Sequence, residues 1–260
     1  MQLDVVDLRR FYDGPVGRIA RLVLRSRLAA LWPDPRGLEI LGYGYATPYL
    51  RPFVPKATRV VAFAPAVQGV APWPRSERNR TALVLEAELP LSDQSIDRIV
   101  VVHGLEGADE PRAVLKELWR VLRPGGRMLV VVPNRRGIWA RFDTTPFGSG
   151  RPFSRGQLSR LLTDCQFQPV AATTALFVPP SARRFVLGAR AWEAIGHRLW
   201  PTFGGVVIVE AEKRLRQGLP ADERARRRLF VPSLQAEPAP SHARRKADGD
   251  RAPPTPGLSA

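Results

Sequence analysis

Short runs of consecutive apolar residues recur along the first half of the chain and alternate with segments of helical periodicity. The runs occupy residues 38–41, 59–63, 82–85, 96–102 and 128–132. Because each run is continuous rather than alternating, it predicts a strand that is buried on both faces of a parallel sheet. Strands that alternate with helices over about 100 residues predict a doubly wound α/β domain.

The helical segments begin and end at recognisable residues. Gly14-Pro15 predicts the start of an amphipathic helix that ends before Trp32-Pro33, and a short helix is expected over 47–53. Residues 109–122 carry apolar positions at a period of 3.6 and end at Arg123-Pro124-Gly125-Gly126. Ser154 and Gln157 form a capping box that predicts a helix to residue 164. Further strands are expected at 167–178 and 205–210, and a helix within 181–199.

These elements divide the chain into three parts. Residues 1–35 are predicted to form an N-terminal helical lead-in, of which 1–13 are polar. Residues 36–212 are predicted to form the α/β domain. Residues 213–260 carry 11 basic and five acidic residues and are rich in proline towards the end. We expect them to form a disordered tail, with a short helix near 224–229.

The first strand leads directly into a glycine-containing segment, Gly42-Tyr43-Gly44, which precedes a predicted helix start at Thr47-Pro48. Glycine lets a backbone approach a ligand closely, and a helix start presents unpaired N–H groups. A strand, a glycine turn and a helix start are typical of a site for a nucleotide-like ligand. The alternative interpretation is a tight turn between strand and helix.

Two further segments resemble a known family. Leu89-Pro90-Leu91-Ser92-Asp93-Gln94-Ser95-Ile96-Asp97 and the helix end Glu117-Leu118-Trp119-Arg120-Val121-Leu122-Arg123-Pro124-Gly125-Gly126 are similar to motifs of the class I S-adenosylmethionine-dependent methyltransferases. The resemblance covers residues 36–134. It implies a Rossmann-like sheet of seven strands, mostly parallel with the last antiparallel. It also implies S-adenosylmethionine as cofactor and a methyl acceptor, which the sequence does not identify.

The resemblance implies cofactor contacts from Gly42, Tyr43, Gly44, Glu86 and His103. Glu86 follows the third strand and is either a contact to the adenine or ribose or a solvated loop acid. His103 ends the fourth strand, where ligands bind in open α/β sheets, and is either a general base, part of the methyl-transfer pocket, or a packing residue. No catalytic residue is assigned.

Other residues are interpreted more simply. Asp97 precedes a buried strand and is expected to be structural. The aromatic residues Trp139, Phe142 and Phe147 follow the fifth strand, where the resemblance implies an acceptor pocket. The single cysteine, Cys165, is expected to be a small buried hydrophobic residue. With three distant histidines and one cysteine, the sequence predicts no metal site.

Composition limits the remaining choices. The formal net charge is +16, but nearly all basic residues are arginine, which favours a compositional bias over nucleic-acid binding. The acidic N-terminus and the lack of a long apolar stretch predict no signal peptide and no membrane association, so we expect a cytoplasmic protein. The oligomeric state is left open.

Two positions depart from the family pattern and support alternative functions. The family has an acid two residues before the first glycine, where this chain has Ile40, and another at the end of the second strand, where it has Ala64. These departures favour a non-catalytic binding or scaffold protein as the alternative to a methyltransferase. Nucleic-acid binding is a third hypothesis. A nicotinamide-dependent dehydrogenase is less favoured, because Gly-x-Gly-x-x-Gly fails at Thr47.

Overall fold

A computed structural model describes residues 4–180 and 189–214, all within a unit that spans 1–215. The expected tail from residue 215, its helix near 224–229 and any helix start within 181–188 lie outside the described residues. The helices are α1 (Val5–Asp13), α2 (Pro15–Leu31), α3 (Thr47–Leu50), α4 (Pro111–Val121), α5 (Arg155–Asp164) and α6 (Ala189–Leu199), with 3-10 turns η1 (Ile138–Arg141) and η3 (Pro201–Phe203). The strands are β1 (Glu39–Gly44), β2 (Arg59–Pro65), β3 (Thr81–Val84), β4 (Ile96–Val102), β5 (Leu122–Pro133), β6 (Phe167–Ala175) and β7 (Val206–Lys213).

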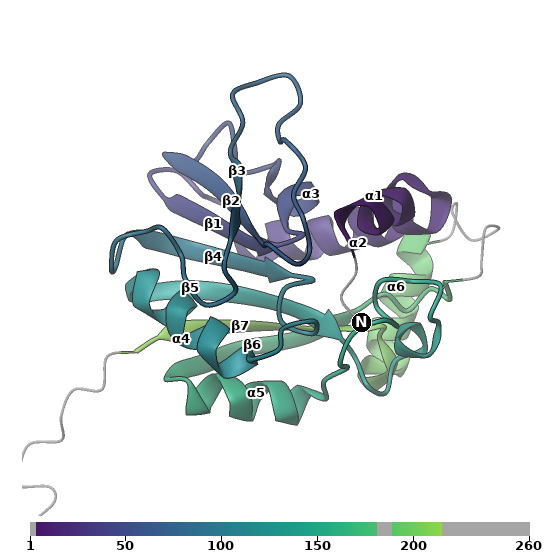
Figure 1. The fold of residues 1–260 in the computed structure, drawn as a ribbon. Helices are drawn as coiled ribbons and strands as arrows, with labels where there is room; N and C mark the ends of the chain where they lie inside the picture. The colour runs from purple at the N-terminus through teal and green to yellow at the C-terminus, as the bar shows by residue number, and fades with distance from the viewer. Residues whose placement is uncertain (1–3, 181–188, 215–260) are drawn as a thin grey trace, which may run out of the picture. The chain divides into compact units, whose positions relative to one another are not determined.

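The seven strands form one sheet in the order β3-β2-β1-β4-β5-β7-β6 (Figure 1). β7 pairs antiparallel with both β5 and β6, whereas the pairs among β1 to β5 are parallel. This arrangement confirms the predicted fold class. The order reverses at β1, so the chain leaves β1 and β4 towards opposite edges of the sheet. Such a point is where open α/β sheets bind ligands.

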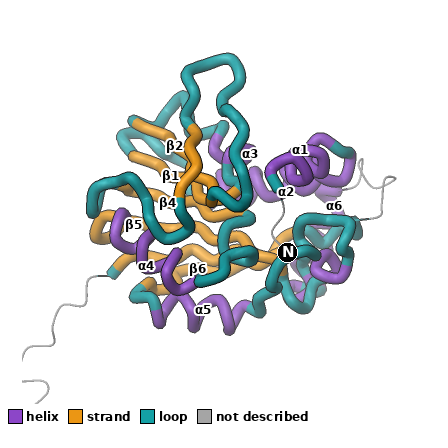
Figure 2. The backbone as a smooth tube through the Cα atoms, viewed as in Figure 1, coloured by secondary structure: helices purple, strands orange, loops and turns teal. Residues whose placement is uncertain are grey.

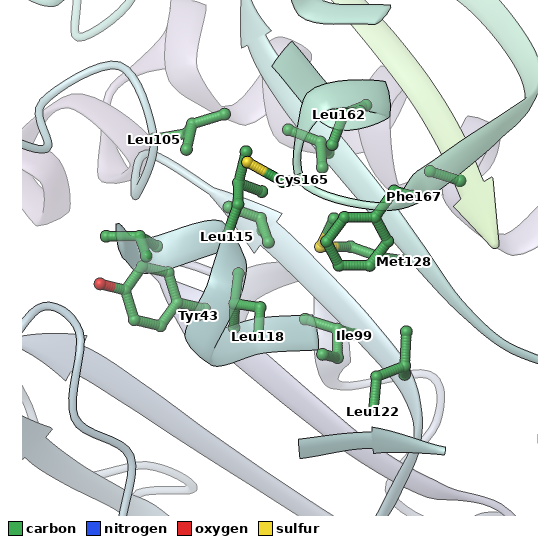
Figure 3. Packing of buried hydrophobic residues seen from close by; sticks show 14 of the residues in the cluster. Tyr43, Ile99, Leu105, Leu115, Leu118, Leu122, Met128, Leu162, Cys165 and Phe167 are labelled. Atoms are coloured by element: carbon green, nitrogen blue, oxygen red, sulfur yellow. The ribbon is translucent and has the colours of Figure 1, made fainter. Parts of the chain in front are cut away.

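Helices cover both faces of the sheet, as the continuous apolar strands predicted (Figures 1 and 2). Alternate residues of each strand enter different hydrophobic clusters. Ile40 packs with α1, α2 and α3, whereas Leu41 and Tyr43 pack with α4 and α5. In the second cluster Cys165 lies among Leu115, Leu162 and Phe167 (Figure 3). Burial raises the pKa of its thiol, which confirms a packing role.

Several local predictions are confirmed in detail. The Ser154 Oγ accepts the Gln157 amide at 3.2 Å, and the Gln157 side chain accepts the Ser154 amide at 3.0 Å, so both halves of the capping box are made. Asp97 is structural: its carboxylate accepts the Glu39 amide and forms an ion pair with Arg123. It therefore ties the start of β1 to β4.

Three elements differ from expectation. The polar lead-in contains helix α1. The Asp4 side chain caps this helix by accepting the Val6 amide, and Leu8 and Tyr12, one helical turn apart, are buried. β1 continues through both glycines to Gly44, so the turn to α3 lies after the glycines. β7 extends through Lys213, one residue into the expected tail, because its Nζ donates to carbonyl oxygens at the end of α4.

Candidate active site

One pocket opens at the carboxyl edge of the parallel strands, with about 390 Å³ of empty space including the part open to solvent. Its walls come from the end of β2, from the residues that follow β3 and β4, and from the loop between β5 and α5. Because the carboxyl ends of parallel strands meet at this edge, the pocket lies where α/β sheets bind ligands. The lining residues are Pro65, Gln68, Glu86, His103, Gly104, Glu106, Gly107, Pro146, Ser149 and Gly150.

A buried chain of hydrogen bonds leads from the N-terminal helices into this pocket. The Tyr49 hydroxyl donates to the Tyr12 oxygen at 2.8 Å, and the Tyr12 oxygen lies 2.8 Å from His103 Nε2. His103 Nδ1 lies 2.9 Å from Glu106 Oε1. The His103 ring is thus held on both sides, by a phenol at Nε2 and by a carboxyl group at Nδ1.

Two buried oxygen atoms of the pocket residues have no hydrogen-bond partner within the described chain. Gln68 donates its Nε2 to the His103 carbonyl at 2.6 Å, but its Oε1 is unpaired. Glu106 Oε2 is likewise unpaired. Leaving a buried acceptor without a donor costs roughly 1–3 kcal/mol, so each of these atoms is a candidate partner for a ligand or a water molecule. Both atoms are acceptors, and a ligand that pairs with them must supply N–H or O–H groups.

The charge of the pocket is opposite to that of the whole protein. Glu86 and Glu106 line it, and none of its ten lining residues is lysine or arginine, although the formal net charge of the chain is +16. A pocket of this kind favours a cationic or hydroxyl-bearing ligand and disfavours a phosphate group.

The structure brings two of the five sequence-predicted site residues into the pocket wall, namely Glu86 and His103. His103 directly ends β4 with a φ of +50°, a conformation that turns the chain into the pocket. Tyr43 is fully buried beneath the wall, and its hydroxyl donates to the Glu86 carbonyl at 2.7 Å. It supports the segment that carries Glu86.

Gly42 and Gly44 are required by packing of the chain against itself. A Cβ on Gly42 would stand 2.5 Å from a methyl group of Leu50, in α3. A Cβ on Gly44 would stand 2.5 Å from the Val102 carbonyl oxygen and 2.8 Å from the backbone of Gly104. Neither glycine is among the residues that line the pocket.

The acidic anchors of the family motif have no direct replacement on β1. Ile40 is buried in the hydrophobic core. Glu39 lies at the opposite end of the strand, where its carboxylate pairs with Arg59. At the end of β2, Gln68 supplies an amide oxygen three residues after Pro65. Sequence reasoning missed Gln68 and Glu106, although each is a polar residue within five positions of a predicted strand end.

The aromatic residues after β5 do not form an exposed acceptor wall. Trp139 and Phe147 are each 1 % exposed, and they pack edge-to-face against Phe11 of α1. The Phe147 ring lies 4.8 Å from the His103 ring, measured between centroids. Trp139 and Phe147 thus pack inward, Phe147 against His103, and the role of this loop in an acceptor pocket stays a prediction.

Two absences hold for the part of the chain that the structure describes. No group of three or more His, Cys, Asp or Glu side chains is placed to hold a metal ion. No described helix has the length and apolar character needed to cross a bilayer.

All four tyrosines of the chain are expected to resist ionisation while it is folded. Burial raises the pKa of Tyr12, Tyr43 and Tyr49 well above the ordinary value, and raises that of Tyr45 to about 12. The unfolded chain would release these phenolic protons near pH 10. Stability contributed by the neutral tyrosines is therefore complete below about pH 10 and is lost as the pH rises through the folded pKa values.

Titration of tyrosinate absorbance tests this expectation, with circular dichroism recorded on the same samples. Absorbance should appear only together with loss of secondary structure, whereas urea-unfolded protein should titrate near pH 10. A full tyrosinate signal near that pH with an unchanged circular dichroism spectrum would contradict it.

The comparisons with known proteins agree with this geometry. Residues 38–130 match the family model of the methyltransferase domain. A probable S-adenosylmethionine-dependent methyltransferase of Mycobacterium tuberculosis is 32% identical over 138 residues, which cover 50% of this chain and 48% of that protein. Another, from Mycolicibacterium smegmatis, is 38% identical over 84 residues, which cover 32% of each protein. The chain thus spans about a third to a half of the length of these curated relatives.

The fold is also found among solved structures. A Thermotoga maritima protein, described as an S-adenosylmethionine-dependent methyltransferase and possible histamine N-methyltransferase, superposes with a TM-score of 0.57. It is 20% identical, and the match covers 81% of this chain and 96% of that one. A methyltransferase from Archaeoglobus fulgidus has a TM-score of 0.53 at 14% identity, covering 74% and 94% of the two chains. From its matched domain and its sheet order, the segment 38–130 is a methyltransferase domain, and the chain is similar to the class I S-adenosylmethionine-dependent methyltransferases.

Proposed function

We propose that the protein is an S-adenosylmethionine-dependent methyltransferase that acts on a small acceptor, and that the pocket at the carboxyl edge holds the cofactor. The observation that carries this proposal is the set of acceptor atoms in the pocket wall, of which Gln68 Oε1, after β2, is unpaired within the described chain. S-adenosylmethionine bears a sulfonium, an ammonium group and ribose hydroxyls, which are the cations and donors that such a wall requires. When bound, it supplies an activated methyl group.

The residues present fit this cofactor, although the usual acid at the end of β2 is missing. Glu86 follows β3 and faces the pocket together with Gln68, so an acid and an amide oxygen are available on the β2–β3 side. Gln68 is held by its bond to the His103 carbonyl, and its backbone carbonyl accepts the Val5 amide of α1. The proposal therefore assigns Glu86, Gln68 and His103 to cofactor binding, with Tyr43 supporting Glu86 from below.

In this proposal the main contributions of the protein are to position the two reactants and to exclude water from them. The α1 residue Tyr12 and the loop residue Phe147 close the sides of His103, and the lining residues Pro146, Ser149 and Gly150 form the opposite wall. Correct placement of two reactants supplies much of the rate enhancement in a direct group transfer.

A second candidate is a non-catalytic protein that keeps the fold. Two observations favour it. Ile40 is buried where the family has an acid, and the space beside Gly42 and Gly44 is filled by Leu50 and by the backbone at the end of β4. The cofactor-binding test distinguishes the two candidates.

The test is calorimetric titration of the protein with S-adenosylhomocysteine. We expect binding that weakens about tenfold in Glu86→Gln, because a charge-assisted hydrogen bond contributes roughly 1.5–3 kcal/mol. Glu88→Gln is the matched control, since Glu88 is an exposed acid of the same loop outside the pocket lining. No binding at millimolar ligand would exclude the enzyme and leave the non-catalytic candidate. Equal losses in both variants would remove Glu86 from the site.

A further inference from the structure

Glu106 combines burial, fixed position and an unpaired oxygen. Its side chain is 5% exposed, and its Oε1 is held by His103 Nδ1. The Arg151 amide donates to the Glu106 carbonyl at 2.8 Å, and a Cβ on Gly150 would stand 2.6 Å from Glu106 Cγ. The carboxylate is thus clamped between the residues after β4 and the segment before α5, with Oε2 left over at the pocket wall.

The two carboxylates of the pocket follow different strands of the sheet. The sheet order β3-β2-β1-β4-β5 places Glu86 and Gln68 after β3 and β2. Glu106 follows β4, and its backbone carbonyl accepts the Arg151 amide of the segment between β5 and α5. Glu86 Oε2 accepts the Asp109 amide at 3.2 Å, whereas Glu106 Oε2 has no partner in the described chain. If the Gln68 side holds the nucleoside, Glu106 is left for the reacting group and the acceptor.

The partners of Glu106 leave its charge uncompensated by any lysine or arginine. Its only ion-pair partner in the described chain is His103, whose Nε2 lies 2.8 Å from the Tyr12 oxygen. Beyond His103 the hydrogen bonds continue to Tyr12 and Tyr49, and Gln68 binds the His103 carbonyl. A buried carboxylate with one free oxygen and no lysine or arginine partner gains from a proton or a cation at that oxygen.

We propose that Glu106 is the proton-accepting catalytic residue at the acceptor end of the pocket, and that the acceptor is a neutral or cationic molecule with an N–H or O–H group. This proposal rests on the proposed methyltransferase function. The acceptor heteroatom uses a lone pair to form the bond to the methyl carbon, and the electron pair of the broken carbon–sulfur bond stays on sulfur. The proton of the acceptor N–H or O–H moves to Glu106 Oε2, giving a neutral carboxylic acid.

His103 and Tyr12 are positioning residues in this scheme. The imidazole holds Oε1, which leaves Oε2 without a partner in the described chain, and Tyr12 holds the other nitrogen of the ring. Phosphorylated acceptors are excluded, because a phosphate would face two carboxylates and no cationic side chain among the lining residues.

Sinefungin provides a test that needs no acceptor, because it carries a protonated amine where the cofactor carries the transferable methyl group. We expect calorimetry to show that the protein binds sinefungin at least about tenfold more tightly than S-adenosylhomocysteine. Glu106→Gln should reduce this preference to within about twofold, while the affinity for S-adenosylhomocysteine changes little. Glu110→Gln, which removes a nearby exposed acid, is the matched control and should keep the full preference.

The outcomes distinguish failure of the proposed function from failure of the Glu106 proposal alone. If S-adenosylhomocysteine does not bind, the proposed function fails and this inference with it. If it binds without any sinefungin preference in the unaltered protein, the inference fails alone, whether or not Glu106→Gln folds. A preference that survives in a folded Glu106→Gln variant also overturns it. Tyr12→Phe should lower the preference by a smaller factor, which a purely structural role for the hydrogen-bond chain would not produce.

Discussion

Gly44→Ala should destabilise the protein by about 3 kcal/mol or more, enough to remove a large part of an ordinary domain's stability. The residue has a φ of +77°, which disfavours any side chain. The added Cβ would also stand 2.5 Å from the Val102 carbonyl and 2.8 Å from Gly104. These atoms belong to the backbone at the end of β4 and in the residues that follow it. No side-chain rotation can therefore relieve the overlap. Urea unfolding measured by circular dichroism tests the prediction.

Gly37→Ala is the matched control for this substitution. Gly37 has a similar φ of +72°, but a Cβ there would meet no atom within 4 Å. It therefore measures the conformational cost alone, which should be about 1 kcal/mol. Equal losses of unfolding free energy in the two variants would show that the contact with β4 contributes nothing to the cost of Gly44→Ala. The result also bears on function, since a variant at Gly44 that unfolds cannot test whether the glycine contacts a cofactor.

His103→Asn should cost about 3 kcal/mol through the buried hydrogen-bond chain. Asparagine tolerates the left-handed conformation at this position, so backbone strain contributes little. Its shorter side chain cannot span the distance between Tyr12 and Glu106, and both groups would stay buried without their partner. The loss should appear as a lower denaturation midpoint in urea with an unchanged m-value.

A double-mutant cycle with Glu106→Leu assigns the cause. If the cost of His103→Asn comes from an unpaired carboxylate, removing that carboxylate should recover part of it, and the double variant should be more stable than the two single losses predict. Losses that add within about 0.5 kcal/mol would show that the two residues act independently. Tyr12→Phe, which removes one hydroxyl between Tyr49 and His103, should cost only about 1 kcal/mol.

Much of the fold follows from local pattern. β4 was predicted with the bounds that the structure has, because seven residues of strand character lie between a turn and His103. The Ser154 capping box and the apolar period of α4 likewise depend on residues within four positions of one another. Helix α1 was missed for the opposite reason. Most of its nine residues are polar, and only Leu8 and Tyr12 are buried against the rest of the molecule.

The candidate site also contains residues that could be predicted from the sequence and residues that could not. His103 and Glu86 were predicted because each directly follows a strand, and topology brings such residues to one edge. Gln68 and Glu106 could not be recognised, since what distinguishes them is an unpaired oxygen, which depends on every neighbouring donor. The relevant partners are distant in sequence: Gln68 binds a carbonyl 35 residues away, and Tyr12 binds a histidine 91 residues away.

The alternation of strands and helices, the seven-stranded α/β architecture and the edge of the sheet that binds ligands could all be predicted from the residues and the family motifs. These properties depend on local hydrophobic period, caps and turns. The packing of Gly42 and Gly44 against α3 and β4, the burial of Trp139 and Phe147, and an acidic pocket within a basic protein became visible only in the fold. Close packing and hydrogen-bond pairing depend on neighbours in space, and those neighbours come from distant parts of the chain.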